Sequence, residues 1–533
     1  MYRFRSGALA LLLVVTACAV NPATGRREIT FMSNEREAAL GREAAAQVAQ
    51  EMGIVDDPEL GAYVAAVGER VARESPRQEV PYRFQIVDIP EPNAFALPGG
   101  YVYVSRGLLV IANSEEELAN VLGHEIGHVA ARHAAQREAA AVPVGVLTAI
   151  GAIAAGIIGG GQAAQAVGQL GQTAGAGLIA SYGRDQEREA DRLGQDYAAK
   201  AGDDPAAMAA FLRTLENATA LEQGETRQPS FFDTHPSTPE RVSAAASFAT
   251  TLPYAAKPGI ARTREEFLRK LDGLVVGQNA EEGVVDGSRL LHPALGFQLR
   301  FPEGWKVRNG RSAVMAVAPN REAAVLLELE APARSPREAA GLFVRQNGLQ
   351  VIEAGAVQLP ATDGFRVLAA VPTQRGPIAA DLTWLAWNGR IYRVTGLALG
   401  GGYRAYQGAF ASVARSFRAI GAQELAGIRE QHLRIVSAQA GESLAQLVAR
   451  TRSSWKADEV AIANALPANV RLQAGQLVKV AVSEPYQTRG APRPSPAPSA
   501  APAPRPAPAA PPAPRAAPAP RATEPATERL EPL

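Results

Sequence analysis

The chain has 533 residues, with 54 Lys and Arg against 53 Asp and Glu, and a net charge of +1. This balance argues against a nucleic-acid-binding protein, while a hydrophobic content of 47% is ample for packed cores. The length predicts roughly three or four domains. Cys18 is the single cysteine, so no internal disulfide can form.

The N-terminus has the pattern of a secretory signal. Arg3 and Arg5 precede an apolar segment from Ala8 to Val15, and Val-Thr-Ala-Cys then ends at Cys18 like a bacterial lipobox. We expect residues 1–17 to be a lipoprotein signal peptide and Cys18 to be lipidated, which would anchor the protein without spanning the bilayer. The alternative is an uncleaved membrane helix, for which the segment is short.

The residue after the cysteine bears on the compartment. Ala19 follows Cys18, in place of the Asp that resembles an inner-membrane retention signal. We therefore expect a periplasmic protein anchored to the outer membrane rather than to the inner one.

A strand is expected ahead of the most informative motif. Pro98, Gly99 and Gly100 predict a turn, and residues 101–104 are rich in strand-forming residues. If residues 96–104 form an edge strand beside residues 124–128, they would bind an extended peptide by β-augmentation. An ordinary hairpin strand is the alternative, and the two are compatible.

Residues 124–128 read His-Glu-Ile-Gly-His, the HExxH pattern in which a helix offers two imidazoles to zinc and a carboxylate to a water molecule. Positions four apart lie about 40° apart on a helix, so His124 and His128 can reach one ion, with Glu125 to the side. The alternative is a solvated surface helix. His133 would lie about 180° from His124, so we expect a surface residue or one with another role.

Two histidines do not complete a catalytic zinc site, which needs a third protein ligand and an open position for water. Glu187 is the best candidate for that ligand. Asp191 lies four residues later on the same helix face, where it could accept a hydrogen bond from the free N–H of a ligating histidine. Taken alone, these charges are more typical of a solvated helix.

Several motifs in register indicate a family. The sequences at 124–128 and 187–191 resemble the HtpX-like and CAAX-prenyl-protease-like gluzincin metallopeptidases. Residues 21–26 resemble the mature start of the periplasmic lipoprotein branch, residues 93–104 the strand ahead of the HExxH helix, and residues 235–241 a downstream HPST-ER segment.

The resemblance covers roughly residues 20–250. It implies a mainly helical gluzincin metallopeptidase domain with a small edge sheet, for which we place boundaries at 18–250. It also implies that His124, His128 and Glu187 bind one zinc ion per chain and that Glu125 is the catalytic base.

In that chemistry zinc lowers the pKa of its bound water toward about 7, and Glu125 takes a proton and returns it to the leaving nitrogen. The oxyanion needs a donor besides the metal. Our candidates are His235, Arg241 and Tyr182, in that order. Alternatively, His235 caps the open zinc position in a resting state, or it is a loop histidine before a proline turn.

No charged residue occurs from Ala139 to Gly183, and much of this segment is apolar. A single membrane span would place His124 and Glu187 on opposite sides of the bilayer, where they could not share a metal. We expect a helical hairpin near the mouth of the site, in contact with lipid or substrate, with structural packing as the alternative.

The later regions carry less information. We expect a linker at 251–285 and a small α/β domain of unknown role at 286–420, whose residues 301–305 weakly resemble the start of Mog/PsbP-like domains. Residues 432–482 follow the order of a LysM-like module, a glycan binder, although an Ala-Leu-Pro-Ala-Asn segment replaces its asparagine-rich middle. This leaves peptidoglycan contact and a structural variant open. The Pro/Ala-rich residues 484–533 are expected to be disordered.

Together these features predict an α+β protein that is a lipid-anchored zinc metalloendopeptidase. Its expected substrates are misfolded or misassembled cell-envelope proteins. One alternative is a chaperone or assembly factor for outer-membrane proteins with a largely capped zinc site. Another is a peptidase associated with peptidoglycan. We expect no nucleic-acid partner.

Overall fold

The computed structural model describes residues 18–29, 32–140, 182–221, 231, 235, 239–371, 378–398 and 402–487. The expected signal peptide, most of the uncharged segment between Ala139 and Gly183, and nearly all of the Pro/Ala-rich tail lie outside these residues. Among the described residues, no helix has the length and apolar character needed to cross a membrane.

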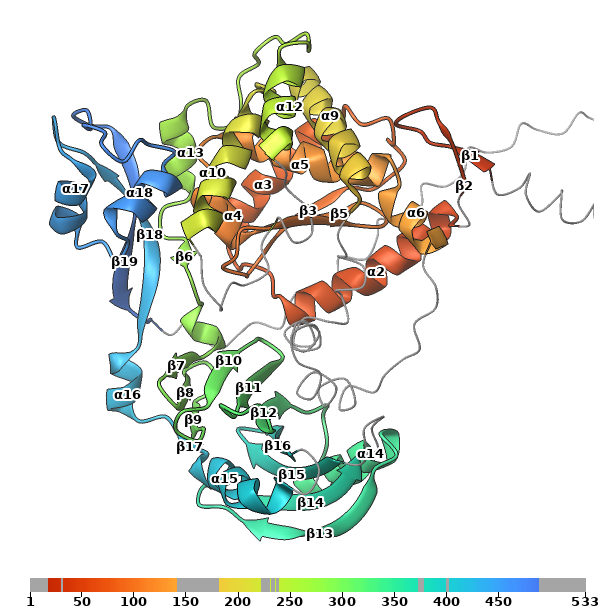
Figure 1. Cartoon of the computed structure of the whole chain (residues 1–533), viewed down its shortest axis with the longest axis vertical. Helices are drawn as coiled ribbons and strands as arrows, with labels where there is room; N and C mark the ends of the chain where they lie inside the picture. The colour runs from red at the N-terminus through yellow and green to blue at the C-terminus, as the bar shows by residue number, and fades with distance from the viewer. Residues whose placement is uncertain are drawn as a thin grey trace, which may run out of the picture. The chain divides into compact units, whose positions relative to one another are not determined.

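The first half of the chain is mainly helical and surrounds a small sheet (Figure 1). Its helices are α2 (Asn34–Glu51), α3 (Pro58–Ala72), α4 (Arg106–Ile111), α5 (Glu115–Ala130), α6 (His133–Ala140), α9 (Arg184–Ala201), α10 (Ala207–Leu221) and α12 (Pro239–Ala249). Its strands are β1 (Cys18–Val20), β2 (Arg27–Ile29), β3 (Arg83–Val87), β4 (Ala94–Leu97) and β5 (Tyr101–Ser105).

The sheet has the order β3-β5-β4, with β5 parallel to β3 and antiparallel to β4. Gly99 and Gly100 have φ values of 76° and 88° and make the tight turn between β4 and β5. The expectation of one edge strand over residues 96–104 is therefore wrong for β5, which is central. In the described sheet the edge strands are β3 and β4, because β5 lies between these two partners.

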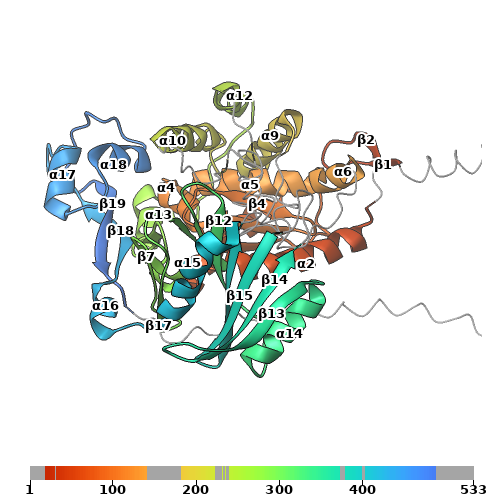
Figure 2. The same ribbon diagram turned by 60° about the horizontal axis from the view of Figure 1, so that its bottom comes forward.

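The HExxH helix, α5, is fixed at both ends by its sequence. The Ser114 side chain accepts a hydrogen bond from the backbone N–H of Glu117 and caps the N-terminus. Residues Leu118, Val121, Leu122 and Ile126 are fully buried at helical spacing. These apolar contacts place α5 in the core, against the sheet and against α9 (Figures 1 and 2).

Glycines let α5 and α9 approach closely. A Cβ atom on Gly194 of α9 would lie 2.4 Å from the backbone nitrogen of His124. A Cβ on Gly123 of α5 would lie 2.7 Å from the Gly194 carbonyl oxygen. Only glycine fits at these two positions without moving a backbone, so this contact sets the distance between the helices.

The middle region is rich in sheet. A four-stranded sheet has the order β17-β9-β8-β7 and a seven-stranded sheet the order β10-β11-β12-β16-β15-β14-β13. The strands are β7 (Val284–Asp286), β8 (Arg289–His292), β9 (Phe297–Arg300), β10 (Lys306–Asn309), β11 (Ala313–Val317), β12 (Ala323–Leu329), β13 (Gln350–Gln358), β14 (Asp363–Val371), β15 (Ile378–Trp387), β16 (Arg390–Ala398) and β17 (Arg418–Ala419).

All the described pairs in these two sheets are antiparallel. The expectation of an α/β domain over 286–420 is therefore corrected to an antiparallel arrangement, with helices α14 (Pro336–Gln346) and α15 (Tyr403–Ser416). Several consecutive strands, such as β7 and β8 or β15 and β16, are joined by short turns, which favour antiparallel pairing.

The last described region is a strand-helix-helix-strand unit. It comprises β18 (Arg429–Ser437), α17 (Leu444–Thr451), α18 (Ala457–Ala463) and β19 (Leu477–Pro485), preceded by the short helix α16 (Ala422–Gly427). β18 pairs antiparallel with β19 and also with β6 (Val275–Val276), which follows helix α13 (Arg264–Lys270) and precedes the one-turn η1 (Ala280–Glu282).

This unit packs into the helical core. Leu433, Leu477 and Ala481 are buried in the same apolar cluster as residues of α3 and α5. Lys479 is fully buried, and its ammonium group donates a hydrogen bond to the carbonyl of Ala112, 2.7 Å away. Burial lowers the pKa of Lys479 well below its usual value.

Gly194→Ala tests the contact between α5 and α9. Because the new methyl group would meet backbone atoms that cannot rotate away, we expect a loss of about 1–3 kcal/mol in the free energy of unfolding. Urea unfolding with a chelator present measures this loss. Gly61→Ala is the matched control, since nothing lies within 4 Å of its added Cβ on α3. An unchanged midpoint for Gly194→Ala would contradict the argument.

Candidate metal centre

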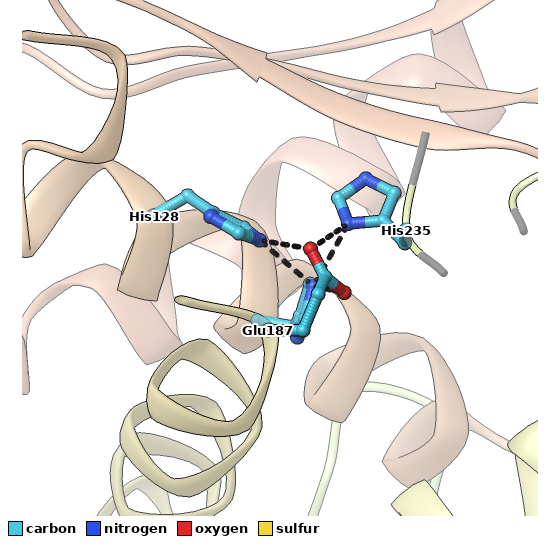
Figure 3. A group of neighbouring side chains, drawn as sticks. His128, Glu187 and His235 are labelled. Carbon is cyan, nitrogen blue, oxygen red and sulfur yellow. Dashed lines mark hydrogen bonds and ion pairs between the residues drawn. The ribbon is translucent and has the colours of Figure 1, made fainter. Parts of the chain in front are cut away.

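Four buried side chains converge between α5 and α9. His124, His128, Glu187 and His235 each offer a ligand atom, and these atoms all lie within 4.8 Å of one another. Figure 3 shows His128, Glu187 and His235 facing a common point. The three residues that the sequence predicts as metal ligands are therefore brought together, and His235 joins them from the segment before α12.

The spacing of the ligand atoms fits a tetrahedral ion. His124 Nε2 lies 3.0 Å from His128 Nε2 and 3.1 Å from His235 Nδ1. Glu187 Oε1 lies 3.4 Å from His128 Nε2 and 3.0 Å from His235 Nδ1. Ligands bound to zinc at about 2.0–2.1 Å stand about 3.3–3.4 Å apart in a tetrahedron.

The contact of His124 Nδ1 with Asp191 determines which ring nitrogen of His124 carries the proton. His124 Nδ1 lies 2.9 Å from Asp191 Oδ1. Burial raises the pKa of Asp191, but Arg241 and His124 outweigh burial and lower it, so the carboxylate is ionised and accepts. Nδ1 therefore carries the proton, and Nε2 presents a lone pair to the centre of the group. The predicted contact between Asp191 and a ligand histidine is present.

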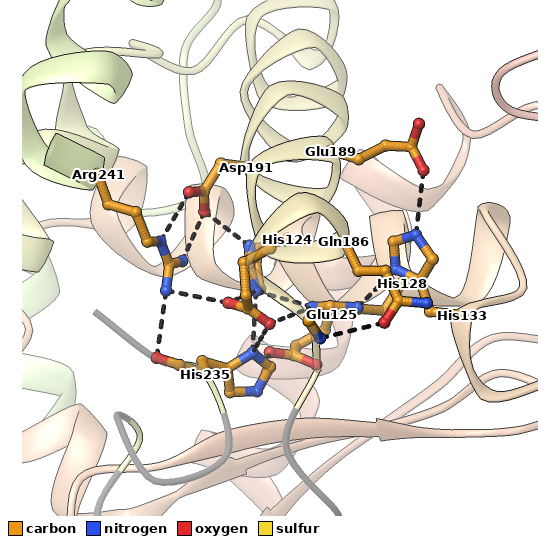
Figure 4. Close-up of polar contacts among 11 residues, drawn as sticks. His124, Glu125, His128, His133, Gln186, Glu189, Asp191, His235 and Arg241 are labelled. Atoms are coloured by element: carbon orange, nitrogen blue, oxygen red, sulfur yellow. Dashed lines mark hydrogen bonds and ion pairs between the residues drawn. The ribbon is translucent and has the colours of Figure 1, made fainter. Parts of the chain in front are cut away.

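His128 is backed by another histidine. Its Nδ1 lies 2.8 Å from His133 Nδ1, and His133 Nε2 lies 3.1 Å from Glu189 Oε2 (Figure 4). In neutral His133, Nε2 donates to Glu189, which leaves Nδ1 to accept from His128. Burial also lowers the pKa of His128 well below its usual value. Its Nε2 thus presents a second lone pair to the same centre.

The surface alternative for His133 is wrong. Helix α5 ends at Ala130, and Arg132 has a φ of 54°, so the chain turns before α6 begins at His133. The angular argument assumed one continuous helix. The turn brings His133 back toward His128, where its side chain is fully buried.

Glu125 is a buried carboxylate that accepts no hydrogen bond from the described residues. Among the described residues, neither of its oxygens has a hydrogen-bond partner, and His235 Nε2 lies 3.5 Å from Oε1. Burial raises the pKa of Glu125. An unsatisfied carboxylate beside converging lone pairs fits a site that holds a cation and a water molecule.

Arg241 ties the two carboxylates of α9 together. Its Nε and Nη2 donate to Asp191 at 2.8 and 2.7 Å, and its Nη1 lies 2.9 Å from Glu187 Oε2 and donates to the His235 carbonyl at 3.2 Å. Burial would raise the pKa of Glu187, but His235, His128 and His124 hold it well below its usual value. Arg241, which was predicted to donate to an oxyanion, instead contacts the carboxylates of Asp191 and Glu187.

Tyr182 covers the other side of His128. The two rings are stacked, with centroids 3.8 Å apart and planes 20° apart. Tyr182, His128 and the β4 residues Ala96 and Leu97 line a small cavity that continues over Pro98. The cavity therefore lies between His128 and β4.

Comparison with known proteins agrees with this geometry. Residues 58–249 match the profile of Peptidase family M48. This part of the chain is similar to the M48 peptidases. The HExxH helix and α9 both lie within it.

Relatives align with the same part of the chain. The beta-barrel assembly-enhancing protease of Escherichia coli K12 is 29% identical over 46% of this chain and 50% of its own. The mitochondrial metalloendopeptidase OMA1 of Schizosaccharomyces pombe is 30% identical over 42% of this chain and 63% of its own. The Escherichia coli metalloprotease LoiP is 32% identical over 30% and 60%. The chain thus spans about half to two thirds of these relatives.

Among solved structures, cyanobacterial PsbP from Synechocystis aligns with 26% of this chain and 95% of its own, at 15% identity and a TM-score of 0.22. This similarity is too low to support an argument about any region. The weak resemblance of residues 301–305 to such domains stays a prediction.

Zinc suits the donors of the M48 domain. Peptidases of this family depend on zinc, and imidazole nitrogens with one carboxylate are ligands that zinc accepts. The sequence pattern missed the contact of His133 with His128, although the five-residue spacing after HExxH was visible. It also gave no sign that Arg241 would pair with both Asp191 and Glu187.

Arg241→Ala tests whether the Arg241 guanidinium balances the charge of the buried carboxylates of Asp191 and Glu187. The substitution leaves Asp191 and Glu187 buried with less positive charge, so we expect a loss of about 3–5 kcal/mol in the free energy of unfolding with a chelator present. Urea unfolding measures it. Arg188→Ala on α9 is the control, because its exposed ion pair with Asp185 is worth less than about 1 kcal/mol. Equal losses in both variants would contradict this account.

Proposed function

We propose that this chain is a zinc-dependent metalloendopeptidase that hydrolyses proteins of the cell envelope. The observation that carries the proposal is the convergence of imidazole lone pairs and the Glu187 carboxylate beside the unpartnered carboxylate of Glu125. We assign His124, His128 and Glu187 as the zinc ligands, Glu125 as the catalytic base and Asp191 as the residue that orients His124.

The residues divide the work of peptide hydrolysis. When bound, zinc would supply Lewis-acid polarisation of the substrate carbonyl and acidify a water molecule. Glu125 takes a proton from that water, helped by a pKa that burial raises, and delivers it to the leaving nitrogen. The free edge of β4 would hold the substrate backbone by strand addition, which favours extended or unfolded segments.

The geometry favours one of the two roles considered for His235, which are a cap on the open zinc position and a donor to the oxyanion. Its Nδ1 lies among the ligand atoms, while its Nε2 points to Glu125. A ring in this place occupies the position that water needs, which favours a cap over an oxyanion donor. A capped site also suits the alternative function, a chaperone or assembly factor that seldom cleaves.

We further propose that the protein works in the periplasm, tethered by lipidated Cys18 to the outer membrane. Support comes from the lipobox-like sequence before Cys18 and from the name of the related beta-barrel assembly-enhancing protease. Misassembled outer-membrane proteins are then the natural substrates. Loss of labelled palmitate incorporation in Cys18→Ser is the expected result, and equal labelling of both proteins would refute the anchor.

The strand-helix-helix-strand unit at 429–485 covers the region that was expected to be LysM-like. However, Lys479 and Leu477 on β19 are buried against the M48 domain. We therefore favour a structural variant over peptidoglycan contact and over a peptidoglycan-associated peptidase. Binding of the purified protein to isolated sacculi would reverse this preference.

Zinc content and casein cleavage test the main proposal. We expect about one zinc per chain in the wild type and in Glu125→Gln, and little zinc in Glu187→Ala. Cleavage should fall by at least about 100-fold in both variants, because one lacks the base and the other the metal. A wild type without zinc would show that the site is assigned wrongly. Complementation of a gene deletion by Glu125→Gln would favour the chaperone.

His235→Ala separates the cap from the oxyanion donor. If His235 caps the site, its removal raises casein cleavage by roughly tenfold, the gain expected when the open state is about 10% populated. If it donates to the oxyanion, cleavage falls by about 100-fold or more. We expect the rise, with zinc content unchanged.

A further inference from the structure

The turn that follows the N-terminal cysteine is attached to the end of the HExxH helix. Asn21 is 2% exposed, and its Nδ2 donates a hydrogen bond of 2.7 Å to the carbonyl of Ala131. Its Oδ1 accepts from the backbone N–H groups of Ala23 and Thr24 at 3.0 and 3.1 Å. One buried side chain thus holds both its own turn and the helix end.

Backbone hydrogen bonds and the pairing of β1 with β2 hold this turn in place. The backbone N–H of Asn21 donates to the carbonyl of Arg26, and that of Gly25 donates to the carbonyl of Asn21, both at 2.8 Å. Gly25 has a φ of 69°, which glycine adopts without strain. Strands β1 and β2 pair on either side and close the loop.

Ala131 occupies the corner between α5 and α6. It is the C-cap of α5, and the next residue, Arg132, has a φ of 54° although it is not glycine. Such a backbone conformation persists only where surrounding contacts hold it. His133 follows directly, so the geometry of this corner decides where its ring lies.

That ring supports a metal ligand. His133 Nδ1 lies 2.8 Å from His128 Nδ1, and Glu189 accepts from the opposite nitrogen of His133. A ligand histidine whose second nitrogen is hydrogen-bonded keeps its ring orientation and its basicity. The chain of contacts therefore runs from Asn21 through the corner to His133 and then to His128.

We propose that Asn21 is a positioning residue of the metal centre, acting through His133 on the ring of His128. The inference rests on the proposed zinc site. It gives a task to the Asn-Pro-Ala-Thr-Gly-Arg motif at 21–26, which the peptidase chemistry itself does not use.

The test is the zinc dissociation constant of the purified full-length protein, measured by competition with a chromophoric chelator. We expect His133→Ala to weaken zinc binding by about 10–100-fold. Asn21→Asp keeps the acceptor for Ala23 and Thr24 but loses the donor to Ala131. It should weaken binding by about fivefold, the equivalent of one hydrogen bond.

Arg26→Gln is the matched control in the same turn. Its side chain is 82% exposed and 3.8 Å from Glu189, so zinc binding should stay within about twofold of the wild type. His133→Gln offers an amide oxygen to His128 and should recover part of the affinity lost in His133→Ala.

A double variant distinguishes positioning from simple stabilisation. If Asn21 acts through His133, Asn21→Asp combined with His133→Ala binds zinc as His133→Ala does, because the two losses are not additive. Additive losses would overturn the proposal, as would wild-type zinc affinity in Asn21→Asp. Urea unfolding with a chelator checks that each variant folds, and Asn21→Ser replaces any aspartate variant that does not.

The outcomes also separate this inference from the proposed function. A wild type that binds no zinc refutes the metal centre itself. A wild type that binds zinc, with Asn21→Asp unchanged, leaves the metal centre intact and refutes only the role of Asn21.

Discussion

The close backbone contact between α5 and α9 is the constraint on which the site depends. Gly123 and Gly194 bring the helices to a distance that any Cβ would increase. In the proposed site, HExxH supplies two ligands and the base from one helix, and the third ligand, Glu187, comes from the other. A wider separation of the helices would move the Glu187 carboxylate away from His128 and His235, whose ring nitrogens now lie 3.4 and 3.0 Å from it.

The two ligand histidines are supported differently. His124 is backed by an ionised carboxylate, Asp191, which Arg241 neutralises in turn. His128 is backed by His133, and the carboxylate of Glu189 lies beyond that second ring. Among the described residues of the proposed site, only His124 would therefore have a carboxylate in direct contact with its second nitrogen. Arg241 offsets the charge of Glu187 as well, so the site gathers three buried carboxylates without a large unbalanced charge.

The sequence predicted most of this centre because helical periodicity is a local property. HExxH fixes His124, Glu125 and His128 on one helix, and the four-residue spacing places Glu187 and Asp191 on one face of another. What it missed depends on where elements end or pair. The helix stops before His133, so an angle calculated along a continuous helix was wrong. The position of β5 inside the sheet depends on β3, which precedes β4 in the chain and pairs in parallel with β5. In the region after residue 286, the pairing of β12 with β16 likewise joins strands that are not consecutive.

Lys479 and its neighbours on β19 complete the core of the first half of the chain. Its ammonium group lies within the protein and meets the carbonyl that ends α4, while Leu477 and Ala481 complete a core begun by residues some four hundred positions earlier. During synthesis, the first half leaves the ribosome before the strand that finishes its packing exists. The core around the HExxH helix is therefore completed by a strand from outside the matched residues 58–249, so a chain that ended after residue 249 would lack part of its own core.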